Sequence, residues 1–124
     1  MKERAKELKA NATKEQAAKG VLDKIAEMPA RDKKIATRIH EIVAEVAPDL
    51  YAKTWYGQPA YFRDTKVVVF LQSAAKFDTR YCTLGFSEDA NLDEGSMWPT
   101  AFAVDTLTDA DEKKIAALIK KAAG

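Results

Sequence analysis

The chain has 124 residues, of which 47% are hydrophobic and 31% charged, and its formal net charge is +1. This length suits one domain with a single core, and the apolar content is too high for an intrinsically disordered chain. The single cysteine excludes an intramolecular disulfide framework, and the longest aliphatic or aromatic run, Val67 to Leu71, is too short to span a bilayer.

The N-terminal half of the chain has the pattern of helices. Residues 1–12 are charged and helix-prone with little apolar surface, so we expect a loosely packed N-terminal helix there. Thr13 followed by Gln16 resembles a capping box that starts the next helix, which ends at or just before Pro29. Isoleucines and valines at helical spacing predict a further helix from about residue 31 to residue 47, before Pro48.

The middle of the chain has the composition of a sheet. All eleven Phe, Trp and Tyr residues lie between Tyr51 and Phe102, and strands favour aromatic residues. A strand over residues 53–56 is expected to lead into a Gly57-Gln58-Pro59 turn. Strands over residues 60–63 and 66–73 flank Asp64-Thr65, a two-residue hairpin turn without the favoured glycine. Residues 67–71 are apolar on both faces, which predicts a central strand covered on both sides.

The last third of the chain returns from strands to a helix. Residues 79–86 and 101–106 are predicted strands, and the polar, acidic residues 87–99 between them are typical of a loop or short irregular helix. Thr108 is a good N-cap for a final helix, with Asp111 three residues later. Helices at both ends with strands between them give an α+β pattern over one domain, residues 1–124.

Catalytic signatures are absent from the sequence. It contains no GxSxG, HExxH, Walker, CxxC or GxGxxG motif. His40 and Cys82 are the only residues of their kinds, and a catalytic Cys-His pair would depend on these single copies. We expect His40 on the flank of a helix and Cys82 buried on a strand, and therefore a protein that is not an enzyme.

The acidic loop is a candidate metal site. Residues 89–95 resemble the start of a calcium-binding loop, but Gly95 falls at position seven instead of six, and Thr100 stands where a glutamate is needed. A solvated acidic loop is therefore the expected structure. A weak site for a hard cation, or loose iron binding, is the alternative, with four candidate ligands: Glu88, Asp89, Asp93 and Glu94.

The densest aromatic patch surrounds the Gly-Gln-Pro segment. Aromatic side chains there would wall a pocket, with Lys53 and Gln58 orienting a ligand and with Lys76 and Arg80 recognising an anion or carboxylate. The competing interpretation is that Trp and Tyr only fill the core between helices and sheet. The candidate ligand-binding residues are Lys53, Trp55, Tyr56, Gln58, Tyr61, Lys76 and Arg80.

The charge pattern argues against nucleic acid as a partner. Residues 51–107 carry five Lys and Arg against seven Asp and Glu, which is a net charge of −2 where phosphate binding needs the opposite sign. The charged first residues also lack the apolar stretch of a signal peptide, so we expect a cytoplasmic protein with no membrane contact.

The segment around Gly57 resembles the YdhG-like proteins, a bacterial family of unknown function. Their pattern is a helix ending near a Pro-Asp turn, then Lys-x-x-Tyr/Trp-Gly-x-Pro-x-Tyr/Phe, then a hydrophobic strand. The matching segments here are residues 47–50, 53–61 and 67–71. The resemblance implies a compact α+β domain with N-terminal helices, an antiparallel sheet of four to five strands and a C-terminal helix. Some relatives are described as frataxin-like iron chaperones, so it also implies iron as a candidate ligand.

Three functions follow as hypotheses. The first is a non-catalytic binding module, a monomer or homodimer, that holds a small molecule or a metal near the aromatic segment. The second is an interaction or assembly domain that acts through its surface, for which the charged N-terminal helix is the motivation. The third is an enzyme whose acid-base chemistry uses Glu88, Asp89 or His40.

Overall fold

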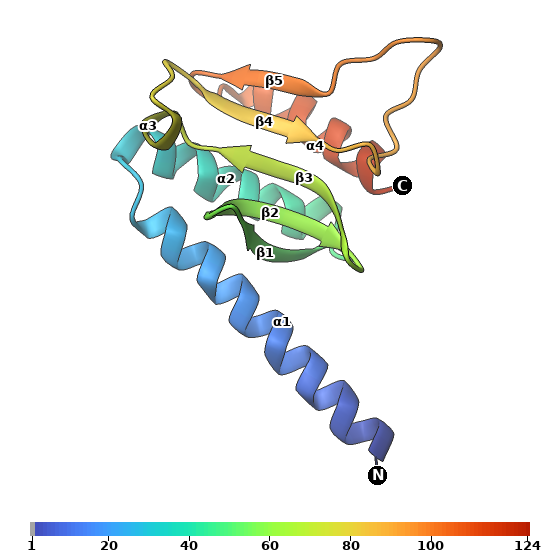
Figure 1. The fold of residues 1–124 in the computed structure, drawn as a ribbon. Coiled ribbons are helices and arrows are strands. Elements are labelled where there is room, and N and C mark those ends of the chain that lie inside the picture. Colours follow the sequence, from blue (N-terminus) through green and yellow to red (C-terminus); the bar gives the residue numbers. More distant parts are fainter. Residues whose placement is uncertain (1) are drawn as a thin grey trace.

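The computed structural model describes the backbone of residues 2–124 and the side chains from residue 13 onward. The α+β prediction is confirmed: helices come first, a sheet follows, and a helix closes the chain (Figure 1). The prediction that residues 1–12 pack loosely falls on side chains outside the described residues. The elements are α1 (Lys2–Ala26), α2 (Ala30–Val46), β1 (Tyr51–Trp55), β2 (Gln58–Arg63), β3 (Lys66–Gln72), α3 (Ala74–Phe77), β4 (Cys82–Phe86), β5 (Ala101–Val104) and α4 (Asp109–Ala123).

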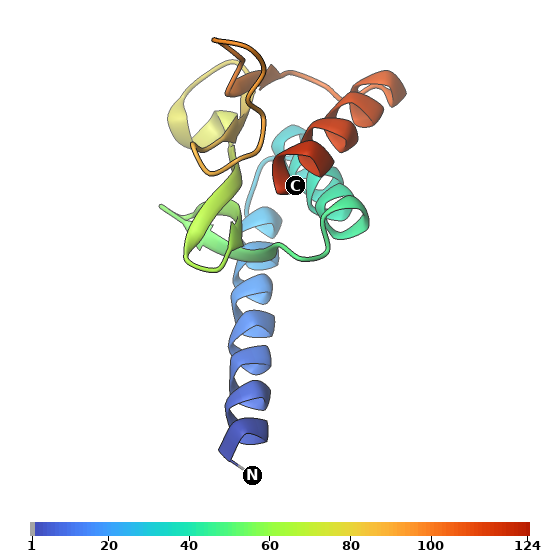
Figure 2. The ribbon, with the colours of Figure 1, turned by 90° about the vertical axis from the view of Figure 1, so that its right-hand side faces the viewer.

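The five strands form one antiparallel sheet in the order β1-β2-β3-β4-β5. Each strand pairs with the next along the chain: two-residue turns join β1 to β2 and β2 to β3, whereas longer segments join β3 to β4 and β4 to β5. The apolar strand β3 is central, as its two-sided hydrophobic pattern predicts. Figure 2 shows α2 and α4 together on one side of this sheet, and α3 follows directly on the end of β3. The side of the sheet that faces α2 and α4 therefore carries the core.

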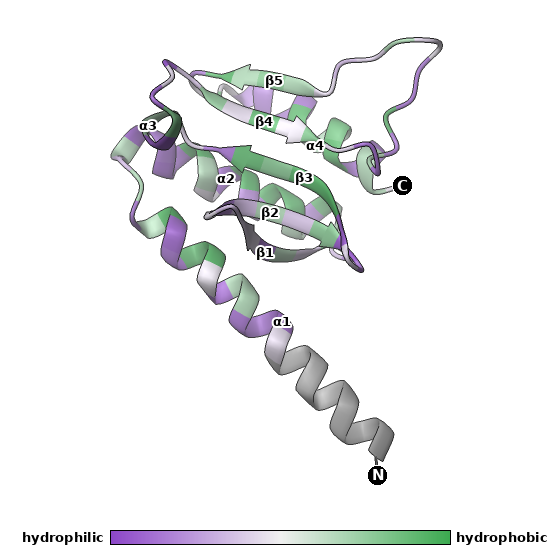
Figure 3. Cartoon of the chain, in the orientation of Figure 1, coloured by the Kyte–Doolittle hydropathy of each residue, from purple (hydrophilic) through white to green (hydrophobic). Residues whose placement is uncertain are grey.

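The core lies between the helices and the inner face of the sheet. Colouring by hydropathy shows green apolar residues on β3 and on the helix turns that face it (Figure 3). Fully buried side chains come from both layers, and among the described side chains of α1 the buried ones are Val21 and Ile25. The largest of these side chains are Tyr61, Ile39, Ile42, Leu71, Leu84, Ile119 and Val21.

Two local predictions about the start of elements are wrong. Thr13 is not an N-cap, because α1 runs without interruption from Lys2 to Ala26. The Lys, Glu and Ala residues before Thr13 are strong helix formers, and an interior threonine costs too little to break the helix. The turn after β1 is Tyr56-Gly57 and not Gly57-Gln58-Pro59, since Gln58 and Pro59 already belong to β2. Pro59 is accommodated because it precedes the first residue pair between β2 and β3.

Other local predictions hold with small shifts. Asp64-Thr65 is the two-residue turn between β2 and β3, and Asp64 adopts a φ of 55° without glycine. The acidic segment after β4 is a loop in the structure. The predicted strand over residues 79–86 starts only at Cys82, because the short helix α3, which the sequence analysis missed, takes the chain up to residue 77.

The start of α4 gives a first testable prediction. Thr108 Oγ1 accepts a hydrogen bond from the Asp111 backbone N–H at 3.2 Å, and Asp111 Oδ2 accepts one from the Thr108 N–H at 3.1 Å. Thr108→Ala removes this capping box and should lower the free energy of unfolding by about 1 kcal/mol. Urea denaturation measures the change, with Thr106→Ala as the matched control. Equal effects of the two substitutions would contradict the capping role.

Candidate functional site

A cavity of about 390 Å³ lies between the β1–β2 turn, β3 and α3. It brings together residues from three parts of the chain, and four of the predicted ligand-binding residues are among them. We call it the aromatic pocket. It is lined by Trp55, Tyr56, Gln58, Phe70, Leu71, Gln72, Lys76 and Phe77.

Aromatic rings form the walls of the aromatic pocket. The Trp55 ring lies 5.2 Å from the Phe70 ring at 56° and 4.9 Å from the Tyr56 ring at 66°, both tilted arrangements that aromatic pairs prefer. Tyr56 is 79% exposed and Phe77 is 43% exposed. Large, exposed aromatic side chains around a concavity form apolar surface in contact with water, and such surface is typical of binding sites.

The turn between β1 and β2 has an unusual backbone that sets the position of the pocket rim. Tyr56 and Gly57 both have positive φ, 52° and 74°, as a two-residue hairpin turn of this kind requires. The Lys76 ammonium donates a hydrogen bond to the Tyr56 carbonyl oxygen at 2.7 Å. A Cβ atom on Gly57 would lie 2.6 Å from Lys76 Nζ, so glycine serves both the turn and the approach of the lysine.

Buried Gln58 connects the hairpin to α3. Its Oε1 accepts a hydrogen bond from the Ser73 backbone N–H at 2.8 Å, and its Nε2 donates to the Gly57 carbonyl at 2.8 Å. Ser73 is in turn the N-cap of α3, because its Oγ accepts from the Lys76 backbone N–H at 3.3 Å. Both polar ends of Gln58 are therefore satisfied within the protein, and Gln58 positions the pocket more than it offers groups to a ligand.

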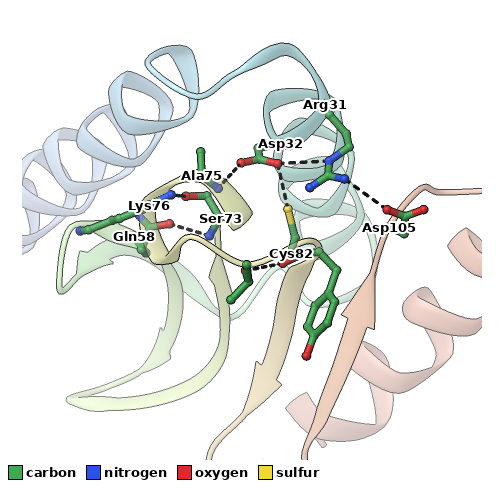
Figure 4. A network of polar contacts seen from close by, with 10 residues as sticks. Arg31, Asp32, Gln58, Ser73, Ala75, Lys76, Cys82 and Asp105 are labelled. Atoms are coloured by element: carbon green, nitrogen blue, oxygen red, sulfur yellow. Dashed lines mark hydrogen bonds and ion pairs between the residues drawn. The ribbon is translucent and has the colours of Figure 1, made fainter.

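A second anchor of α3 comes from α2 and was missed in the sequence analysis. Asp32 is 2% exposed, and its Oδ2 accepts a hydrogen bond from the Ala75 backbone N–H at 3.0 Å (Figure 4). The Cys82 thiol donates to Asp32 Oδ1 at 3.4 Å, and Arg31 Nε lies 3.6 Å from the same oxygen. Burial, with the bond to Asp32 adding to it, raises the pKa of Cys82 to about 11, so this thiol is protonated at neutral pH.

Three predicted ligand-binding residues do not line the aromatic pocket. Tyr61 lies on the helix-facing side of the sheet, where its hydroxyl is 3.0 Å from His40 Nδ1, and burial raises the pKa of Tyr61. Lys53 Nζ lies 6.0 Å from the centre of the Phe62 ring, and the Arg80 guanidinium lies 5.7 Å from the Tyr81 ring. For Tyr61, the prediction that aromatic residues fill the core is therefore the correct one.

The His40–Tyr61 pair predicts a pH dependence of stability. Burial lowers the pKa of His40 below its ordinary value of 6.5, and the nearby Glu41 carboxylate offsets this only in part. Because the pKa of His40 is lower in the folded state, the unfolded chain binds more protons than the folded chain as the pH falls. The contribution of neutral His40 to the free energy of unfolding is therefore complete above about pH 6.5 and is lost as the pH falls below that value. Between pH 7.5 and pH 5, the wild type should therefore lose more unfolding free energy than His40→Gln. Equal losses in urea denaturation would contradict the prediction.

The acidic loop does not bring its carboxylates together. Asp89 forms an ion pair with Lys66 at 3.6 Å, and Glu94 forms one with Lys121 at 3.9 Å. Among the residues that the structure describes, no group of three His, Cys, Asp or Glu side chains is placed to hold a metal ion. The predicted ligands Glu88, Asp89, Asp93 and Glu94 are therefore not assembled into a site.

A larger cavity of about 540 Å³ lies between α2 and the segment that leads into α4. Most of the charged groups in its lining are paired: Arg31 pairs with Asp105 at 3.2 Å, and Arg38 pairs with Glu112 and Glu41. The hydrogen bond that Arg38 donates to Glu112 is the main cause of the raised pKa of Arg38. Because five of the six charged side chains in this lining, all but Lys34, form ion pairs, this cavity is a weaker candidate than the aromatic pocket despite its size.

Comparison with known proteins adds no identification. No family model matches the chain, no curated protein is similar to it, and no solved structure matches its fold. The resemblance to the YdhG-like proteins therefore stays a prediction. In the described part of the chain, none of the helices combines the length and the apolar content of a membrane span.

Proposed function

We propose that the protein is a non-catalytic binding module that holds a small, flat, apolar molecule in the aromatic pocket. The observation that carries this proposal is the cavity itself, about 390 Å³ in volume and walled by the rings of Trp55, Tyr56, Phe70 and Phe77. This volume is within the range of small-molecule sites, and flat molecules stack on aromatic walls at low cost in conformational entropy.

The chemistry of the lining supports binding without catalysis. The described lining residues include no Ser, Cys, His or carboxylate side chain. His40 lies on the other side of the sheet, and the Cys82 thiol is buried against Asp32. Of the described lining residues, Lys76 and Tyr56 carry the only groups that can act as nucleophile or base, and the Lys76 ammonium donates to a backbone carbonyl and not to a side-chain base.

Nuclear magnetic resonance with a neutral aromatic probe, 2-naphthylmethanol, tests the proposal. The chain has two tryptophans, and only Trp55 lines the aromatic pocket, while Trp98 packs against the core. The probe should shift the indole N–H signal of Trp55 and the amide signals of Phe70 and Phe77, and leave the Trp98 indole unchanged.

Trp55→Ala should weaken binding of this probe about tenfold, because it removes one aromatic wall. Trp98→Ala is the matched control and should leave the affinity unchanged. The proposal fails if millimolar probe leaves the Trp55 indole unmoved, or if both variants lose affinity equally.

A further inference from the structure

We infer that the ligand of the aromatic pocket is an aromatic carboxylate, whose negative group is held by the ammonium of Lys76. This inference rests on the proposed function and adds the chemical class of the ligand to it. Among the described lining residues, Lys76 alone carries a charge. An apolar cavity with one cation at its rim favours a flat molecule with one anionic group.

The charge of Lys76 has no counterion among the residues that the structure describes. Within the described chain, no carboxylate lies within ion-pair distance of its Nζ, whereas Lys66, Lys121 and Arg38 each pair with an acid. Lys76 Nζ contacts instead the Tyr56 carbonyl at 2.7 Å and lies 5.9 Å from the centre of the Phe77 ring. An incoming carboxylate would therefore not have to displace an acidic side chain.

The lysine is also held in place before a ligand arrives. Its backbone N–H is bonded to the Ser73 cap, and its ammonium is bonded to the β1–β2 turn. An ammonium has three donors, so two N–H groups remain for a carboxylate. Because the side chain is already ordered, binding costs less rotamer entropy than it would for a free surface lysine.

The neighbouring cavity of about 360 Å³ is a poorer place for the anion. It shares Gln58 and Lys76 with the aromatic pocket, but it is also lined by Lys24 and Glu27, which lie 3.6 Å apart as an ion pair. The Glu27 carboxylate would repel an anion there. The aromatic pocket offers a cation without an acid and, in addition, ring faces for the apolar body of the ligand.

The test compares 2-naphthoate with 2-naphthylmethanol, which share the ring system and differ in charge. Calorimetric titration at pH 7.5 uses the wild type, Lys76→Met and Lys53→Met. Lys53 is the matched control because it is an exposed lysine on β1 outside the pocket. The wild type and Lys53→Met should bind 2-naphthoate about tenfold more tightly than the alcohol, and Lys76→Met should bind both equally.

The outcomes separate this inference from the proposed function. If the wild type binds both probes with equal affinity, or if both lysine variants lose affinity for 2-naphthoate equally, the inference is overturned and the proposed function stands. If neither probe binds, the proposed function is overturned as well. Lys76→Arg separates the loss of charge from any structural effect of Lys76→Met. This variant keeps the charge and should keep the preference for 2-naphthoate.

Discussion

Replacing Gly85 by alanine is expected to lower the free energy of unfolding by about 3 kcal/mol, because overpacking a filled site forces side chains out of position. Gly85 lies in β4 directly opposite Phe70 in β3. A Cβ atom there would lie 2.1, 2.4 and 2.7 Å from three carbons of the Phe70 ring. The ring cannot turn away freely, since Trp55 packs against it at 5.2 Å. Urea denaturation gives the magnitude, and the displaced ring should also weaken probe binding in the aromatic pocket.

Two further variants show whether the Phe70 ring is the cause. Gly20→Ala is the matched glycine control: no atom lies within 4 Å of its added Cβ, and the residue is inside α1, so alanine should stabilise by about 0.5–1 kcal/mol. Gly85→Ala combined with Phe70→Ala should cost less than the sum of the single substitutions. Additive costs, or a neutral Gly85→Ala, would show that the ring and the glycine do not depend on each other.

Replacing Asp32 by alanine is the second large expected effect, a loss of about 2–3 kcal/mol. The change leaves the Ala75 N–H without its acceptor in a partly buried place and removes the partner of the Cys82 thiol. Because Asp32 anchors α3, which carries Lys76 and Phe77, affinity for both naphthyl probes should fall too. Hydrogen exchange of the Ala75 amide should become faster, and Cys82, which is fully buried in the wild type, should react sooner with thiol reagents.

Asp105 provides the control for the Asp32 prediction. It pairs with the same Arg31, but its side chain is 76% exposed. Exposed ion pairs contribute little, so Asp105→Ala should cost less than about 1 kcal/mol and leave the Ala75 amide unchanged. Asp32→Asn keeps the size and one acceptor oxygen, and should lie between the wild type and Asp32→Ala. Equal costs for Asp32→Ala and Asp105→Ala would refute the anchoring role.

Half of the candidate site could be predicted from the sequence. Trp55, Tyr56, Gln58 and Lys76 were expected to bind a ligand, and the structure places all four at one cavity. The other four lining residues, Phe70, Leu71, Gln72 and Phe77, were missed, because their contribution depends on how β3 and α3 fold back toward the hairpin. The residue that could have predicted α3 is Ser73, a good N-cap residue three residues before Lys76 that marks the start of this helix.

Tyr61 shows why the face of a strand was hard to predict. The turn was expected at Gly57-Gln58-Pro59, and the structure has it at Tyr56-Gly57. Side chains alternate along a strand, so a small shift in where a strand begins exchanges the residues of the two faces. Tyr61 thereby belongs to the helix side with His40, while Trp55 belongs to the pocket.

The sequence by itself determined the features that depend on neighbours a few residues away or on overall patterning. These are the α+β arrangement, the capping box of Thr108, the Asp64-Thr65 turn and the central place of β3. Only the tertiary structure decided the pocket and its anchors, since Asp32 is 43 residues from Ala75 and 50 from Cys82. A contact over that separation depends on the packing of whole elements, and no local propensity encodes it.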